Sequence, residues 1–175
     1  MTLSHLLKND ALAMYRATEG LFRLVDDLDW KPETGRNWMT TGQLLHHCTN
    51  ACGYCFNGFV TGDWGLPEGQ EISDLPDEEM LPPAEAMPQV GSVEKALDLL
   101  DADRALCLEV LQGLDDQRLL SERLTAPWGG PELPLFQHLN GMIWHLGQHK
   151  GQLFYYLKLQ GRDVNTMHLW GAGAE

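Results

Sequence analysis

Two pairs of histidines are the residues of this sequence best suited to bind a metal ion. His145 and His149 lie four residues apart in the stretch HLGQHKGQ, and His46 and His47 are adjacent in an earlier segment. In an α-helix a spacing of four turns the side chain by only about 40°, so the first two imidazoles can reach one ion. Two hydrogen-bonded core histidines would show the same spacing. The zinc-protease pattern H-E-x-x-H is not met, because no Glu lies between them.

A third ligand is expected from a facing helix, where His46 and His47 are the candidates. His47 borders the apolar stripe of its segment, whereas His46 points almost opposite to it. Burial therefore favours His47 as the ligand and His46 as a solvent-side or supporting residue. The sequence predicts a divalent-metal site of His47, His145 and His149, with at least one position open for water or substrate. Neutral imidazole suits zinc, nickel, iron or copper, and the geometry of the site decides among them; zinc or nickel is the expected cofactor.

Three cysteines follow the second histidine pair at the spacing C-x3-C-x2-C. Radical S-adenosylmethionine enzymes hold a four-iron cluster with this spacing, but in a loop after a strand of a much larger α/β barrel. On a helix, Cys48, Cys52 and Cys55 fall within about 60° of one another on an apolar face. Free cysteine packs as a small hydrophobe. We therefore expect core residues that form neither a cluster nor a mutual disulfide.

The overall charge narrows the classes of partner. Acids outnumber bases 25 to 12, which gives a formal net charge of −13. This sign opposes phosphate backbones and anionic lipid, so we expect neither nucleic acid nor a membrane as a partner. The sequence shows no leader pattern and no stretch of transmembrane length, which predicts a cytoplasmic protein with reduced thiols.

Helical periodicity predicts four long helices, and no convincing set of strands accompanies them. The helices are expected at residues 3–28, from Thr40 or Thr41 to Phe59, from the cap Ser92 to about 111, and from Pro134 to Gln160. A length of 175 residues fits one domain, 1–175. These elements indicate an all-α protein built as a four-helix bundle.

The segment 67–91 differs from the rest of the chain. It contains five prolines, seven acids and no Lys or Arg. Such a composition predicts a long irregular connection that lies over the bundle or near the mouth of the site. A connection of this length can carry a crossover, so the second and third helices can run parallel. A short hairpin is expected around Gly129 and Gly130.

Nearly the whole chain resembles the DinB-like superfamily, which includes the bacillithiol and mycothiol S-transferases. The resemblance rests on WKP at 30–32, TTGQLLHH at 40–47 and HLGQHKGQL at 145–153, in the expected order. It implies a four-helix bundle of up-down-down-up topology. It also implies a divalent metal held by one histidine of the second helix and two of the fourth, which here are His47, His145 and His149.

The function that the resemblance suggests is metal-dependent transfer of a low-molecular-weight thiol. A bound cation lowers the pKa of thiol or water and makes a nucleophile. The alternatives are a metal-dependent hydrolase and a non-catalytic metal-binding or stress-response module, so whether the protein is an enzyme stays open. Lys150, expected to be solvated, and Arg162 are the candidate cations for a thiol that carries carboxylates. A small-molecule substrate is the expected partner. The oligomeric state stays open, with a homodimer as one possibility.

Overall fold

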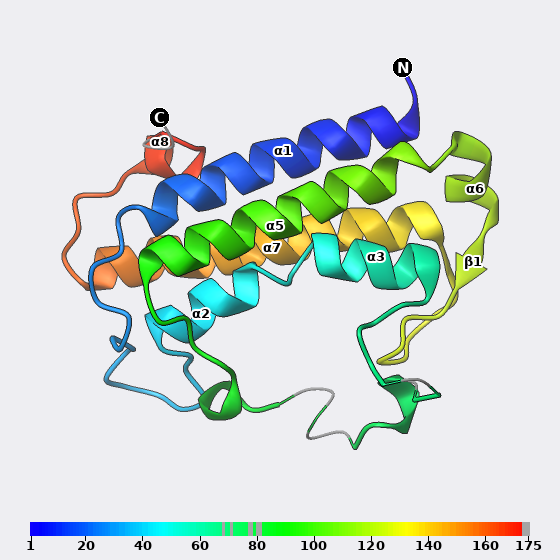
Figure 1. Cartoon of the computed structure of the whole chain (residues 1–175). Coiled ribbons are helices and arrows are strands. Elements are labelled where there is room, and N and C mark those ends of the chain that lie inside the picture. The colour runs from blue at the N-terminus through cyan, green and yellow to red at the C-terminus, as the bar shows by residue number, and fades with distance from the viewer. Residues whose placement is uncertain (68, 71, 77–78, 80–81, 173–175) are drawn as a thin grey trace.

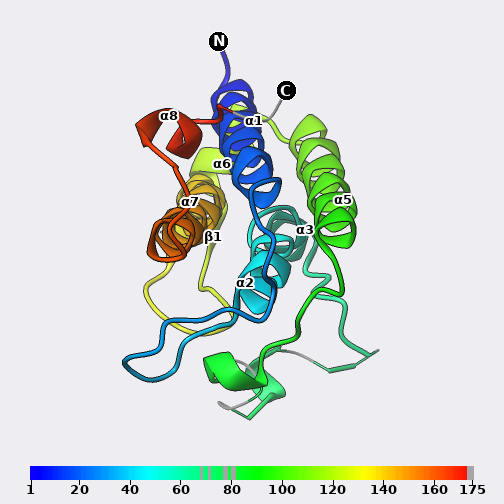
Figure 2. The same ribbon diagram turned by 90° about the vertical axis from the view of Figure 1, so that its left-hand side faces the viewer.

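Four long helical elements form the protein. The computed structural model describes residues 1–175 except 68, 71, 77–78, 80–81 and 173–175. The long elements are α1 (Leu3–Phe22), α2 (Thr41–Cys48) continued by α3 (Gly53–Thr61), α5 (Val93–Gln112) and α7 (Leu135–Leu159). Viewed along the bundle, α1, α5, α7 and the α2–α3 pair occupy its four corners (Figure 2). The expected all-α four-helix bundle is therefore confirmed.

The direction of the helices follows the expected up-down-down-up order. In Figure 1 the α2–α3 pair runs opposite to α1, α5 runs parallel to α2–α3, and α7 returns antiparallel to α5. The minor elements are η1 (Ile72–Asp74), η2 (Ala84–Ala86), α6 (Asp116–Ser121), α8 (Thr166–Leu169), and the antiparallel strands β1 (Arg123–Leu124) and β2 (Leu133–Pro134). The two strands form the hairpin expected around Gly129 and Gly130. Within the described residues, no helix combines the length and the apolar character needed to cross a membrane.

The first helix ends at Phe22, six residues before the expected end at 28. The apolar pattern continues after the helix because Val25 still packs into the core. Asp27, however, accepts hydrogen bonds from the backbone N–H groups of Asp29 and Trp30, at 3.0 and 3.1 Å. Such local side-chain bonds offer the backbone an alternative to the helix, and they hold residues 27–30 outside it.

The second helix was expected to run unbroken to Phe59, and this prediction is wrong, because the chain leaves the helix at 49–52. The cause is a buried carboxylate on α5. Asp103 accepts hydrogen bonds from the N–H groups of Gly53 (2.9 Å) and Tyr54 (2.7 Å), which open α3, and from the hydroxyl of Tyr15 (2.6 Å). A Cβ at Gly53 would lie 1.9 Å from the carbonyl oxygen of Asp103, so only glycine permits this approach. Asp103 thus starts a new helix from outside its own segment.

The connection between α3 and α5 is irregular where the structure describes it. It contains the single turns η1 and η2 and lies beneath α2 and α3, on the side away from α1 (Figures 1 and 2). Its later part is tied to the start of α2. Met87 carbonyl accepts from the amide of Gln43 at 2.7 Å, and Gly42 carbonyl accepts from Val90 N–H at 3.3 Å. The predicted irregular connection is confirmed over its described residues.

The cysteine triplet packs in the core as expected. Cys48, Cys52 and Cys55 are free, buried thiols. Burial raises the pKa of Cys55 to about 12 and raises that of Cys48 further still, which leaves both as neutral thiols at physiological pH. The helical break places Cys52 just before α3 without removing it from the core.

Replacing all three of these cysteines with alanine should lower stability and leave metal binding intact. Each change removes one buried sulfur, which costs on the order of 1 kcal/mol through lost burial and packing. Urea unfolding would measure the first effect and elemental analysis the second. Visible iron–sulfur absorption in anaerobically purified wild-type protein would contradict the packing role.

Candidate metal centre

Three histidine side chains from two facing helices converge on one point. His145 and His149 project from successive turns of α7, and His47 projects from the last turn of α2. The Nε2 atom of His47 lies 3.2 Å from Nε2 of His145 and 3.0 Å from Nε2 of His149. Of the described His, Cys, Asp and Glu residues, these three form the one group whose ligand atoms all lie within 4.8 Å of one another.

The start of α2 fixes the direction in which His47 projects. Thr40 caps the helix by accepting from the N–H of Gln43 at 3.2 Å, and the Gln43 side chain accepts in return from Thr40 N–H at 2.8 Å. This reciprocal capping box satisfies two backbone donors at once. The helix that carries His47 is therefore anchored at its cap, seven residues or about two turns before the histidine.

The donor set fits a divalent cation. The side-chain oxygen of Gln152 lies 2.7 Å from Nδ1 of His149 and accepts a hydrogen bond from its N–H. The proton therefore resides on Nδ1, and Nε2 keeps a free lone pair directed at His47. Nδ1 of His145 is buried without a well-formed hydrogen bond. The backbone of Ala51 lies near this ring and raises the pKa of His145, which partly offsets the effect of burial. Three lone pairs that face one another repel unless a proton or a cation lies between them. Ligand nitrogens at 2.0–2.1 Å from a tetrahedral zinc would be about 3.4 Å apart, close to the distances here.

Burial keeps these imidazoles neutral. It is the main cause that lowers the pKa of His47 to about 3, and the neighbouring His149, His145 and His46 lower it further. Burial also lowers the pKa of His145 and of His149, while the Gln152 hydrogen bond partly offsets the effect at His149. Metal ligation requires the neutral form of imidazole, so the site is ready to bind at physiological pH.

The same burial predicts how the metal-free protein responds to acid. An unfolded histidine titrates near 6.5, whereas folded His47 titrates near 3, so the unfolded chain binds more protons between these values. The free energy of unfolding should therefore fall as the pH drops through about 6.5 toward 3. Urea unfolding in chelator at about pH 7.5 and about pH 5.5 would measure this loss. His47→Gln should lose less over the same interval, and an equal loss in the variant would contradict the assignment.

A cavity of about 760 Å³ opens beside the three histidines. Its walls come from α2, α3 and α7, from the segment before α2, from the 125–132 loop, and from the connection that follows α3. Most lining side chains are apolar, and they include three aromatic residues and three methionines: Tyr54, Trp64, Trp128, Met39, Met87 and Met142. The connection contributes Ile72 and Leu75, so it lies at the mouth of the site as the sequence predicts.

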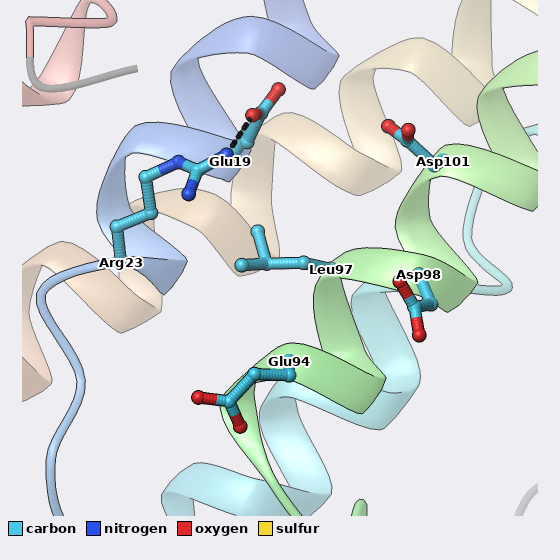
Figure 3. Close-up of a pocket in the computed structure, with 6 residues that line it drawn as sticks. All are labelled: Glu19, Arg23, Glu94, Leu97, Asp98 and Asp101. Carbon is cyan, nitrogen blue, oxygen red and sulfur yellow. Dashed lines mark hydrogen bonds and ion pairs between the residues drawn. The ribbon is translucent and has the colours of Figure 1, made fainter. Parts of the chain in front are cut away.

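A second cavity, of about 310 Å³, lies between α1 and α5 and differs in character (Figure 3). It is lined by Glu19, Arg23, Leu97 and three further acids of α5. Arg23 pairs with Glu19 at 2.6 Å. The acids on α5 point apart rather than toward a common centre in Figure 3. The three-histidine cavity is therefore the stronger candidate for a functional site.

The remaining histidines lie outside the cluster. His46 is partly exposed and does not join the convergent group, in agreement with its expected orientation. The Nε2 atom of His138 donates to the carbonyl of Leu124 at 2.8 Å, and its ring stacks on Phe59, which makes it a packing residue. His168 closes a capping box at the start of α8.

Lys150 was expected to be solvated, and this prediction is wrong. Its ammonium group is buried, donates to the carbonyl of Leu169 at 2.8 Å and lies 5.1 Å from the centre of the Trp170 ring. The C-terminal segment folds over α7 and covers it, which local periodicity does not reveal. Arg162 pairs with Asp26. Neither cation lines the three-histidine cavity.

Sequence reasoning missed the residue that orients His149. Gln152 follows it by three positions, and residues three apart lie side by side on a helix, so the spacing carried this signal. The cavity wall had no comparable signal, because its residues come from segments far apart in the chain.

Comparison with protein families gives a match that spans most of the chain. The chain matches the DinB superfamily over residues 13–153, a span that contains α2, α3, α5 and all three convergent histidines. Comparison with curated proteins and with solved structures gives no match. The match covers well over half of the 175 residues and agrees with the observed bundle. The chain therefore belongs to the DinB superfamily.

Proposed function

We propose that the protein binds one divalent metal ion through His47, His145 and His149 and transfers a low-molecular-weight thiol to an electrophile. The observation that carries the proposal is the convergence of three neutral Nε2 atoms at the wall of a large cavity. When bound, a divalent cation lowers the pKa of a coordinated thiol or water and supplies a nucleophile at neutral pH. Three protein ligands leave further positions for that group.

The residues of the chain have separate tasks in this proposal. Burial holds the three imidazoles neutral, and Gln152 fixes the tautomer and ring orientation of His149. The apolar walls limit water at the site, which strengthens electrostatic interactions there and protects a reactive electrophile from hydrolysis. The electrophile occupies the cavity, where the histidine wall sets its distance from the nucleophile.

Metal analysis followed by a thiol screen tests the proposal. Protein purified without chelator should contain about one equivalent of zinc or nickel per chain by elemental analysis. Metal-loaded protein should then accelerate the reaction of bacillithiol, mycothiol or glutathione with 1-chloro-2,4-dinitrobenzene, and His149→Ala should abolish the acceleration. Bound metal without acceleration for any thiol would indicate a non-catalytic module. Ester hydrolysis in place of thiol transfer would indicate a hydrolase, and protein that takes up no metal would overturn the proposal.

A further inference from the structure

The cavity beside the three histidines has no Lys or Arg side chain among its described wall residues. The chain contains 12 Lys and Arg residues, all of them in the part that the structure describes, and none lines this cavity. Among the described lining residues, Glu79 is the one carboxylate. The net charge of −13 adds to the negative potential around it. Away from the histidine wall, an anionic ligand would therefore lose hydration on entry and find no Lys or Arg side chain to pair with.

The polar groups in the wall are largely engaged with the protein itself. The Tyr54 hydroxyl donates to the carbonyl of Trp64. The side-chain oxygen of Asn37 accepts from Ala84 N–H at 2.8 Å, and the Asn50 amide donates to the carbonyl of His46 at 3.2 Å. These bonds use part of the hydrogen-bonding capacity that would otherwise recognise a polar ligand. The cavity therefore offers mainly hydrocarbon, thioether and aromatic surface, with the three Nε2 atoms at one wall.

Size and composition of the wall suit a compact, ring-containing molecule. A volume of about 760 Å³ lies within the range of about 300–1,000 Å³ that is usual for small-molecule sites. Trp64 and Trp128 meet edge to face, with their ring centres 6.0 Å apart, and present aromatic surface. Met39, Met87 and Met142 add flexible thioethers, which adapt to ligands of different shape and contact aromatic rings favourably.

We propose that this cavity selects an uncharged, largely apolar small molecule, and that anionic ligands of the same shape are excluded. The selectivity is argued from the cavity wall alone. Only the role of the bound molecule, as the electrophile of the reaction, rests on the proposed function. A thiol that carries carboxylates must then keep them outside the cavity, with only its sulfur directed to the histidines.

Two fluorescent probes that share one ring system test the selectivity. N-phenyl-1-naphthylamine is uncharged, and 8-anilinonaphthalene-1-sulfonate adds one sulfonate to the same rings. We expect the folded protein to bind the uncharged probe at least about tenfold more tightly, which corresponds to about 1.4 kcal/mol. Titrations are made at physiological salt, with and without Zn²⁺. Equal affinity, tighter binding of the sulfonate or binding of neither probe would overturn the inference.

A charge-matched pair of variants separates the cavity from the overall charge. Leu75→Lys places a cation in the cavity wall, whereas Leu120→Lys adds the same charge at an exposed position on α6. The first variant should bind the uncharged probe more weakly and should reduce the affinity ratio of the uncharged probe to the sulfonate at least about fivefold. The second should leave the preference unchanged. The same change in both variants would show that net charge, rather than the cavity, sets the selectivity and would also overturn the inference.

The outcomes distinguish this inference from the proposed function. Preferential binding of the uncharged probe by protein that takes up no Zn²⁺ would support the cavity assignment and remove the metal-dependent reaction. Zn²⁺ uptake and thiol transfer together with tighter binding of the sulfonate would retain the reaction and remove the selectivity.

Discussion

Alanine at His47, His145 or His149 is expected to abolish binding of the divalent ion and to remove the thermal stabilisation that the ion gives. Each change deletes one of three converging ligands, and the ion joins α2 to α7 only while both helices contribute. Metal that binds only the folded state adds about 2.7 kcal/mol when its free concentration is 100-fold above Kd. Calorimetric Zn²⁺ titration and thermal unfolding with and without Zn²⁺ would measure both effects.

Two further variants serve as controls for the ligand assignment. His46→Ala changes the neighbouring, partly exposed histidine and should keep metal content and melting temperature close to wild type. Gln152→Ala removes the hydrogen bond to His149 and should weaken binding by about 10- to 100-fold without abolishing it. Loss of metal in His46→Ala with retention in His47→Ala would reverse the assignment on α2.

Asp103→Ala is expected to lower the free energy of unfolding by about 3–5 kcal/mol, far more than an average substitution. The carboxylate is buried and accepts three hydrogen bonds, from the Tyr15 hydroxyl and from the N–H groups of Gly53 and Tyr54. Its loss removes the acceptor of the Tyr15 hydroxyl and of Tyr54 N–H, at about 1–3 kcal/mol each before relaxation, whereas Gly53 N–H keeps the Tyr15 oxygen as an acceptor at 3.1 Å. Urea unfolding followed by circular dichroism would measure the change.

Exposed Asp98 on the same helix provides the matched control. Asp98→Ala should change the free energy of unfolding by less than about 0.5 kcal/mol. Tyr15→Phe keeps the ring and removes one of the three donors, so it should cost about 1–2 kcal/mol. Equal stability of Asp103→Ala and Asp98→Ala would contradict the role of the buried carboxylate as the start of α3.

Local sequence signals predicted the bundle where both ends of a helix carry their own markers. Pro134 before α7 and Gly161 just after it, with φ +80°, bound that helix within one residue of the prediction. The interruption after α2 had no such marker. It depends on Asp103, which approaches from α5 and lies 50 residues away from Gly53 along the chain. Periodicity within one segment cannot report a capping group supplied by another.

The histidines of the candidate site were predictable from local sequence, whereas their surroundings were not. Angular spacing along single helices was enough to group His145 with His149 and to favour His47 over His46, and the structure brings those three together. The environment of Lys150 was not predictable, because the C-terminal segment that covers it shares no pattern with α7. The cavity was not predictable either, since its composition depends on which side chains of the α3–α5 connection face the histidines.

The division of the site between bundle and connection has a consequence for how such a protein can change. The histidines belong to helices whose packing sets the stability of the whole chain, whereas part of the cavity wall belongs to an irregular segment. Met87 and Val90 tie the end of that segment to α2. The part of the segment before Met87 can therefore vary in length and in side chains. Lengthening a surface loop costs little, about 0.6 kcal/mol for each doubling. Exchange of residues 64–82 between homologues, or their randomisation, should therefore alter the choice of ligand while the ion-binding helices stay as they are.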